Sequence, residues 1–180
     1  RDLDQPAGTV EVGHDRLDGG VGNDVMIGGT GDDTYIVDAA GDVVSEAALG
    51  GVRDKVFSEV SFILGAEVED LELVEGAALN GTGNGLANIL IGNSGNNLLD
   101  GKLGIDRMEG GGGDDTYVVE TAGDAVVEIV GFGTDTVRSA LGYVLGSALE
   151  HLTLLGTAAV NGTGNGFDNV LTGNVAINGL

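Results

Sequence analysis

The chain has 180 residues with no cysteine and 35 glycines, and its 29 acidic side chains against seven Lys and Arg give a formal net charge of −22. This balance argues against nucleic acid and anionic membranes as partners, because both need clustered cations, and it favours cations instead. The lack of cysteine excludes disulfides and a thiolate zinc site, and no apolar run is long enough for membrane insertion.

Two copies of one long unit make up the chain. The segment "GGTGDDTYIVDAAGDVVSEA" (28–47) reappears at 110–129, and "NGTGNGLANILIGN" (80–93) reappears at 161–174 with an offset shorter by one residue. One residue is therefore extra in the first copy, near Leu49. We predict one continuous repeat array over 1–180, with unit one at about 10–100 and unit two at about 101–180.

A nine-residue pattern, G-G-x-G-x-D-x-U-x with U a large apolar residue, covers 19–36 and 101–118. Each nonapeptide predicts a six-residue turn followed by a short strand x-U-x, with U pointing inward. The glycine content argues against helices, and two nonapeptides would form one coil of the chain. Flanking segments keep the register, so that position six is occupied by Asp15, Asp24, Asp33, Asp42, Asp106, Asp115 and Asp124.

The spacing of these aspartates predicts a cation site. If successive coils stack at the parallel-strand spacing of about 4.8 Å, Asp15 lies beside Asp33, and Asp24 lies beside Asp42. Two carboxylates about 5 Å apart repel by roughly 3 kcal/mol at an effective dielectric of about 20. Calcium fits between them, because it accepts about six to eight carboxylate and carbonyl oxygens; magnesium fits less well, and zinc prefers His or Cys.

The rest of each unit follows other patterns. Calcium turns are expected at 10–45 and 101–126, and wider coils with half-buried strands are expected at 46–80 and 127–161, where apolar and polar residues alternate. Coils 81–100 and 162–180 keep the ninefold register with asparagine at position six. We expect stacked asparagines to satisfy the turn hydrogen bonds without metal; they are Asn88, Asn97, Asn169 and Asn178.

Segments 19–36 and 101–118 resemble the hemolysin-type calcium-binding nonapeptides of RTX (repeats-in-toxin) proteins, as in serralysin-like C-terminal domains. The resemblance implies an all-β, right-handed parallel β-roll, or β-solenoid, with several calcium ions between stacked turns. Glu11 and Lys102 depart from the pattern, since they replace glycine at position two. The ligand sets that the resemblance implies are Gly13 and Asp15 with Gly28, Thr30 and Asp33; Gly20, Gly22 and Asp24 with Val37, Ala39 and Asp42; Gly104 and Asp106 with Val119, Thr121 and Asp124; and Gly95 and Asn97 with Gly110, Gly112 and Asp115.

No catalytic motif is present: the chain has no G-x-S-x-G, no H-E-x-x-H and no cysteine nucleophile. We therefore expect a non-catalytic calcium-binding module of a secreted bacterial protein, which folds on binding calcium outside the cell; the resemblance adds type I secretion. The chain is expected to be part of a longer protein. Two alternatives stay open, namely an adhesive array that binds extracellular polysaccharide and an appended domain of a secreted enzyme such as a protease or epimerase.

Overall fold

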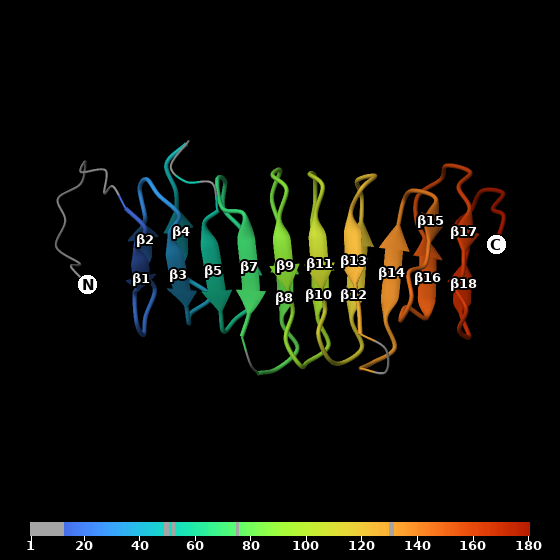
Figure 1. Ribbon diagram of the computed structural model, residues 1–180, viewed down its shortest axis with the longest axis horizontal. Coiled ribbons are helices and arrows are strands. Elements are labelled where there is room, and N and C mark those ends of the chain that lie inside the picture. The colour runs from blue at the N-terminus through green and yellow to red at the C-terminus, as the bar shows by residue number, and fades with distance from the viewer. Residues whose placement is uncertain (1–12, 49–50, 52, 75, 130–131) are drawn as a thin grey trace.

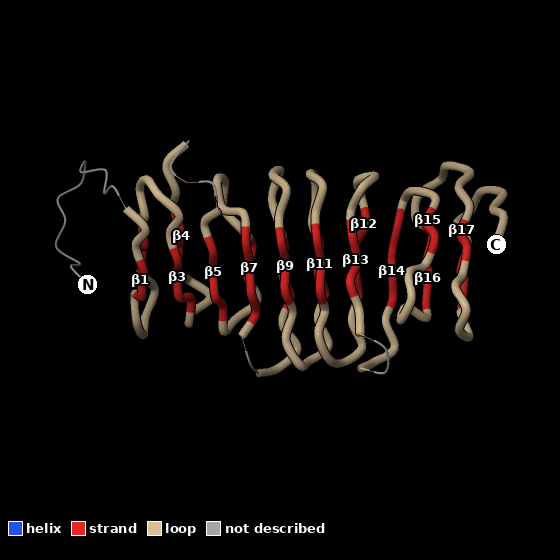
Figure 2. The backbone as a smooth tube through the Cα atoms, in the orientation of Figure 1, coloured by secondary structure: helices blue, strands red, loops and turns tan. Residues whose placement is uncertain are grey.

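The computed structural model describes residues 13–48, 51, 53–74, 76–129 and 132–180. The chain is a parallel β-solenoid whose coils advance along the long axis of the molecule, from the N-terminal to the C-terminal end (Figure 1). Strands occupy the middle of each coil and turns form both edges, and no helix occurs among the described residues (Figure 2). No helix able to cross a membrane is found in this part of the chain.

Two seven-stranded parallel sheets form the two faces of the solenoid. The first has the order β1 (Arg16–Asp18), β3 (Thr34–Val37), β5 (Lys55–Ser58), β7 (Asp70–Leu73), β9 (Ile89–Ile91), β11 (Arg107–Glu109), β13 (Ala125–Val127). The second has the order β18 (Val170–Thr172), β16 (His151–Leu154), β14 (Thr136–Ser139), β12 (Thr116–Val119), β10 (Leu98–Asp100), β8 (Asn80–Thr82), β6 (Phe62–Ile63). Two short sheets pair β2 (Val25–Ile27) with β4 (Val43–Ser45), and β15 (Tyr143–Val144) with β17 (Gly162–Thr163).

Strand register confirms that a nonapeptide is half a coil. Arg16 pairs with Thr34 and Leu98 pairs with Thr116, in each case two nonapeptides later in the sequence. Each nonapeptide thus crosses the solenoid once, and equivalent turns return to the same edge after two nonapeptides.

The coils between the nonapeptide runs differ in length. Asp33 and Asp54, which directly precede the paired strands β3 and β5, are 21 residues apart. Asp54 and Glu69, which precede β5 and β7, are only 15 residues apart, so the first of these coils is longer than a nonapeptide pair and the second is shorter. In unit two, the aspartates that precede β12 and β14 are 20 residues apart. The one-residue difference places the extra residue of unit one between β4 and β5, a segment that contains Leu49, which lies outside the described residues.

Strand pairing continues across the boundary between the two sequence units. Ile89 of β9 pairs with Arg107 of β11, and Leu98 of β10 pairs with Thr116 of β12. The division into two units near residue 100 remains a prediction from the sequence repeat, and the hydrogen-bonded sheets run through it.

The core is a column of U side chains enclosed between the sheets. Tyr35, Met108 and Tyr117 are fully buried, and Met26 is nearly so. In the longer strand β3 the alternation also buries Val37, two residues after Tyr35. Burial of such a side chain contributes about 1.5–3 kcal/mol, so a core this narrow depends on each coil stacking closely on the next.

Gly31 shows how closely the turns stack. Its φ is +124°, and a methyl group added there would overlap the carbonyl group of Gly13 in the preceding coil. Only glycine fits a turn position that combines this backbone conformation with direct contact to another backbone.

Gly31→Ala should therefore destabilise the folded chain by more than about 1 kcal/mol, as expected for alanine at a positive φ. Gly85→Ala is the matched control, because nothing lies within 4 Å of the added carbon there. Urea unfolding of both variants in saturating calcium measures the difference. Equal midpoints would contradict the stacking of Gly31 on Gly13.

Candidate metal centre

Position-six residues, and the acids that take their place in the irregular coils, form columns along both edges of the solenoid. Each of these residues directly precedes a strand, and that strand pairs with the equivalent strand one coil later. The first column follows the first sheet, the second column follows the second sheet, and a short column accompanies β2 and β4. The first contains Asp15, Asp33, Asp54, Glu69, Asn88, Asp106 and Asp124; the second contains Asn97, Asp115, Asp135, Glu150 and Asn169; the short one contains Asp24 and Asp42.

One hydrogen bond recurs along these columns. The backbone N–H of Asp15 donates to Oδ1 of Asp33 at 2.6 Å, and that of Asp24 donates to Oδ1 of Asp42 at 3.0 Å. Asp106 N–H donates to Oδ1 of Asp124 at 3.1 Å. The structure thus brings together the three aspartate pairs that the sequence predicts, and one oxygen of the later carboxylate is held by the preceding coil.

The columns continue into the irregular coils, which sequence reasoning missed. Asp33 N–H donates to Asp54 at 2.7 Å, and Asp54 N–H donates to Glu69 at 2.8 Å. In unit two, Asp115 N–H donates to Asp135 and Asp135 N–H donates to Glu150. The available signal was an acid two residues before a buried strand residue, as in Asp54 before Val56.

Several of these carboxylates keep an oxygen with no partner. Among the described residues, one buried side-chain oxygen lacks any hydrogen bond in each of Asp24, Asp33, Asp54, Asp106 and Asp115. A buried acceptor without a partner costs about 1–3 kcal/mol, and more when it is charged. Calcium, which takes carboxylate oxygens as ligands, is chemically suited to these positions.

Turns with asparagine at position six differ from the aspartate turns in their hydrogen bonds. The amide nitrogen of Asn88 donates to the carbonyl oxygens of Val68 and Glu69, both at 3.1 Å, and its Oδ1 accepts from Asn84 N–H at 2.8 Å. Such turns satisfy both ends of the side chain within the protein, as the sequence predicted.

Asn97 follows the same pattern. It donates to Leu79 O and accepts from Asn93 N–H, both at 2.8 Å, while its own backbone N–H donates to Asp115 Oδ1. A ligand role for Asn97, with Gly95, Gly110 and Gly112, remains a prediction.

Asp42 and Asp124 close the two aspartate runs in a different way. Oδ2 of Asp42 accepts from the N–H groups of Asp38 and Ala39, both at 3.2 Å, and the Ala39 carbonyl in turn accepts from Asp42 N–H. Asp124 makes the same contacts with Glu120 and Thr121. Both carboxylates therefore have donors at each oxygen, and ligation by the Ala39 and Thr121 carbonyls remains a prediction.

The other backbone ligands that the resemblance implies are placed as follows. Val37 and Val119 end strands β3 and β12, and their carbonyl oxygens accept from Glu59 N–H and from Ser139 Oγ. Thr30 O accepts from Gly13 N–H. Positive φ values occur at the predicted glycines Gly13 (156°), Gly20 (74°), Gly22 (133°) and Gly104 (122°), and also at Lys102 (66°), which occupies a glycine position of the motif.

Burial makes the charged form of these acids unfavourable. It raises the pKa of Asp106 and Asp115 to about 6, with smaller contributions from the neighbouring charges of Asp124 and Asp135. Burial also raises the pKa of Asp33 and Asp54, which repel each other. These carboxylates are therefore poised to take up positive charge, as protons or as a cation.

The comparison with protein families bears on the choice of cation. The family model of the RTX calcium-binding nonapeptide repeat (4 copies) matches residues 11–44 and 82–117. These segments are RTX calcium-binding repeats. No curated protein and no solved structure matches the chain. The matched segments include the short column and the Asp15, Asp33, Asp106 and Asp115 turns. The partnerless oxygens of Asp24, Asp33, Asp106 and Asp115 therefore lie within the matched repeats.

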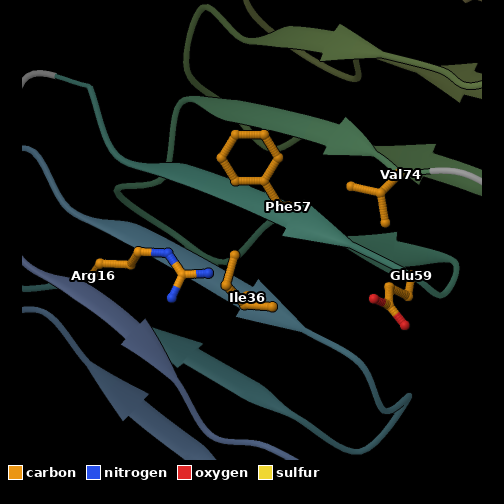
Figure 3. A pocket seen from close by; sticks show the side chains of 5 residues that line it. All are labelled: Arg16, Ile36, Phe57, Glu59 and Val74. Carbon is orange, nitrogen blue, oxygen red and sulfur yellow. The ribbon is translucent and has the colours of Figure 1, made fainter. Parts of the chain in front are cut away.

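A hollow on the outer face of the first sheet lies apart from the columns. It measures about 420 Å³ and is lined by Arg16, Ile36, Phe57, Glu59 and Val74 (Figure 3). Lys55 Nζ lies 4.4 Å from the centre of the Phe57 ring. This hollow contains none of the position-six residues, so it is separate from the candidate metal centre at the turns.

Metal-free protein should lose stability as the pH rises from about 4 to 6. The ordinary pKa of Asp106 and Asp115 is 3.8 and rises to about 6 on folding, so the folded state binds more protons between these values. Their protonation stabilises the fold at low pH, and this contribution is lost as the pH passes through the folded-state pKa. Far-UV circular dichroism in chelator at about pH 4 and pH 7 tests this; more strand signal at pH 7 than at pH 4 would contradict it.

Proposed function

We propose that the chain is a non-catalytic calcium-binding module of a secreted protein, which folds and gains stability when it binds calcium outside the cell. The observation that carries the proposal is the set of buried, partnerless carboxylate oxygens at position six of the RTX repeats. The repeats supply the identity of the ion, and the partnerless oxygens supply the reason that the fold needs it.

Folding and calcium binding are coupled through the columns. In the unfolded chain the acidic side chains are separated and hydrated. In the folded chain they stack and lose water, so the cost of gathering their charge in the columns opposes folding. Bound calcium supplies positive charge to the columns and oxygen ligation in place of water. The chain's part is to present one carboxylate oxygen while the backbone N–H of the preceding coil holds the other, as at Asp33 and Asp115.

The arrangement favours ligation over acid–base catalysis. A catalytic pair needs two groups whose surroundings drive their pKa values apart. Here burial raises the pKa of both members of a neighbouring pair, Asp33 and Asp54, in the same direction. Tyr35 and Tyr117, the largest polar side chains nearby, are fully buried in the core. These features support a structural role within the module, whatever the rest of a longer chain does.

The proposed location outside the cell rests on affinity and charge. Extracellular calcium modules bind with Kd on the order of 10⁻⁴–10⁻³ M, so they are loaded at extracellular calcium and empty in the cytosol. A chain with a net charge of −22 would stay loose where calcium is scarce, which suits passage out of the cell, and would fold where calcium is abundant.

Calcium titration tests the proposal directly. In excess chelator at pH 7, the far-UV circular dichroism of the full chain should show little strand signal, and millimolar calcium should restore it cooperatively. Magnesium at the same concentration is the control for ionic strength and should restore much less, because it favours rigid octahedral sites. An unchanged, folded spectrum in chelator would overturn the proposal.

A double-mutant series tests one predicted site. Asp24→Asn and Asp42→Asn should each remove the same calcium ion, because both residues belong to the short column, and the double variant should lose no more than either single one. Asp168→Asn changes the same charge at an exposed position and should keep full stoichiometry. Isothermal calorimetry counts the ions; separate losses from the two single variants would mean that the residues do not share a site.

A further inference from the structure

Glu46 lies outside the nonapeptide pattern but keeps its register. It follows β4 directly and comes two nonapeptides after Gly28, the position-one glycine of the preceding coil. A methyl group on Gly28 would overlap Oε1 of Glu46, Oδ2 of Asp33 and the hydroxyl of Tyr35. The missing side chain of Gly28 therefore leaves the space in which these three oxygens meet.

Three carboxylates converge at this place. One oxygen from each of Asp33, Glu46 and Asp54 lies within 4.8 Å of the other two. Asp33 and Asp54 are each only 1% exposed, and Oδ2 of both is buried without a hydrogen-bond partner. Oδ1 of both is already held by a backbone N–H, so the free oxygens are the ones left for a ligand.

Glu46 is oriented by two donors. The hydroxyl of Tyr35 donates to Oε1, and the backbone N–H of Ala47 donates to Oε2 at 3.2 Å. Tyr35 is itself fixed in the core, so its hydroxyl is a rigid support for the carboxylate. Burial, followed by repulsion from Asp54 and Asp33, raises the pKa of Glu46 to about 7.

The same group recurs in unit two. Asp115, Glu128 and Asp135 also place one oxygen each within 4.8 Å of the others, and Asp115 Oδ2 is buried without a partner. Tyr117 donates to Glu128 Oε1, and a methyl group on Gly110 would overlap the equivalent three oxygens. The loops that follow differ in length by one residue, yet the cluster is kept.

We propose that each of these clusters, Asp33–Glu46–Asp54 and Asp115–Glu128–Asp135, binds one divalent cation of the size and hardness of calcium. Each site shares one aspartate, Asp33 or Asp115, with a predicted nonapeptide ligand set. It differs from that set because Glu46 and Glu128 belong to no nonapeptide and Asp54 and Asp135 lie beyond the matched repeats. The inference rests on the proposed function. It adds a site at the point where each aspartate run meets the irregular coils.

The chemistry of the donors favours such a cation. Three carboxylates carry more negative charge than a buried space accommodates alone, and all three are hard oxygen ligands. Zinc would prefer nitrogen or sulfur donors, and neither cluster contains His. The competing occupant is a proton shared among the carboxylates, which would leave Glu46 neutral and the cluster without metal.

Glutamine substitutions separate the two occupants. Glu46→Gln should lower the calcium stoichiometry of the full chain by one, and Glu46→Gln with Glu128→Gln should lower it by two, measured by calorimetry at pH 7. Glu59→Gln is the matched control, since it removes the same charge from an exposed side chain and should leave the stoichiometry unchanged. The double variant should also be more folded than wild type in chelator, because it buries two fewer charges.

The outcomes distinguish this inference from the proposed function. Wild-type stoichiometry in the Glu46 and Glu128 variants would overturn the inference and leave calcium-dependent folding intact, whereas a wild-type chain that binds no calcium would overturn both. If the variants do not fold even in calcium, tyrosine-sensitised terbium emission decides, since the chain has three Tyr and no Trp. Tyr35→Phe with Tyr117→Phe should abolish most of the emission and Tyr143→Phe should not; emission unchanged by the double substitution would overturn the inference.

Discussion

The acidic columns depend on one hydrogen bond, from the backbone N–H of one column residue to the carboxylate that follows it one coil later. Parallel coils in the regular segments repeat after every two nonapeptides, so any side chain at this position is stacked on its equivalent. Where that side chain is aspartate, the bond fixes one carboxylate oxygen and leaves the other facing its own turn, as at Asp33. The geometry that makes the fold repetitive therefore also gathers its negative charge into columns.

The second side-chain atom at this position is satisfied in different ways in different coils. At Asn88 and Asn97 the side-chain oxygen accepts from an N–H of its own turn, and the amide nitrogen donates to carbonyls of the preceding coil, so neither atom needs an ion. Asp42 receives two N–H groups from its own turn. Asp33 and Asp115 have neither solution, and they are the residues at which glutamate from the next coil adds a further carboxylate. The partnerless buried carboxylate oxygens are thus confined to particular turns among the described residues, and the proposed calcium dependence would be concentrated there.

Much of the fold follows from the sequence, because a ninefold period leaves few alternatives. Glycine-rich turns and single large apolar residues, such as Tyr35 and Met108, specify half-coils with one inward side chain, and the structure confirms this. The acids of the irregular coils could not be placed in the same way. Asp54 and Glu69 end coils that are longer and shorter than two nonapeptides, so counting by nine misses both. Glu46 could have been identified from the sequence, since it keeps the two-nonapeptide offset from Gly28. Recognising its role, however, required knowing that Gly28 leaves a space beside Asp33.

Coupling between the two kinds of coil would let the proposed local ion requirement affect the whole array. In a solenoid each coil contacts only its neighbours, so stability passes along the axis through successive interfaces. The neutral asparagine coils are not independent of the acidic ones, because Asn88 N–H donates to Asp106 and Asn97 N–H donates to Asp115. Glu69 O accepts from Asn88 on the other side. The Asn88 coil is therefore bonded to acidic coils on both sides, and loss of charge compensation at Asp106 or Asp115 removes the surface on which an asparagine coil is stacked.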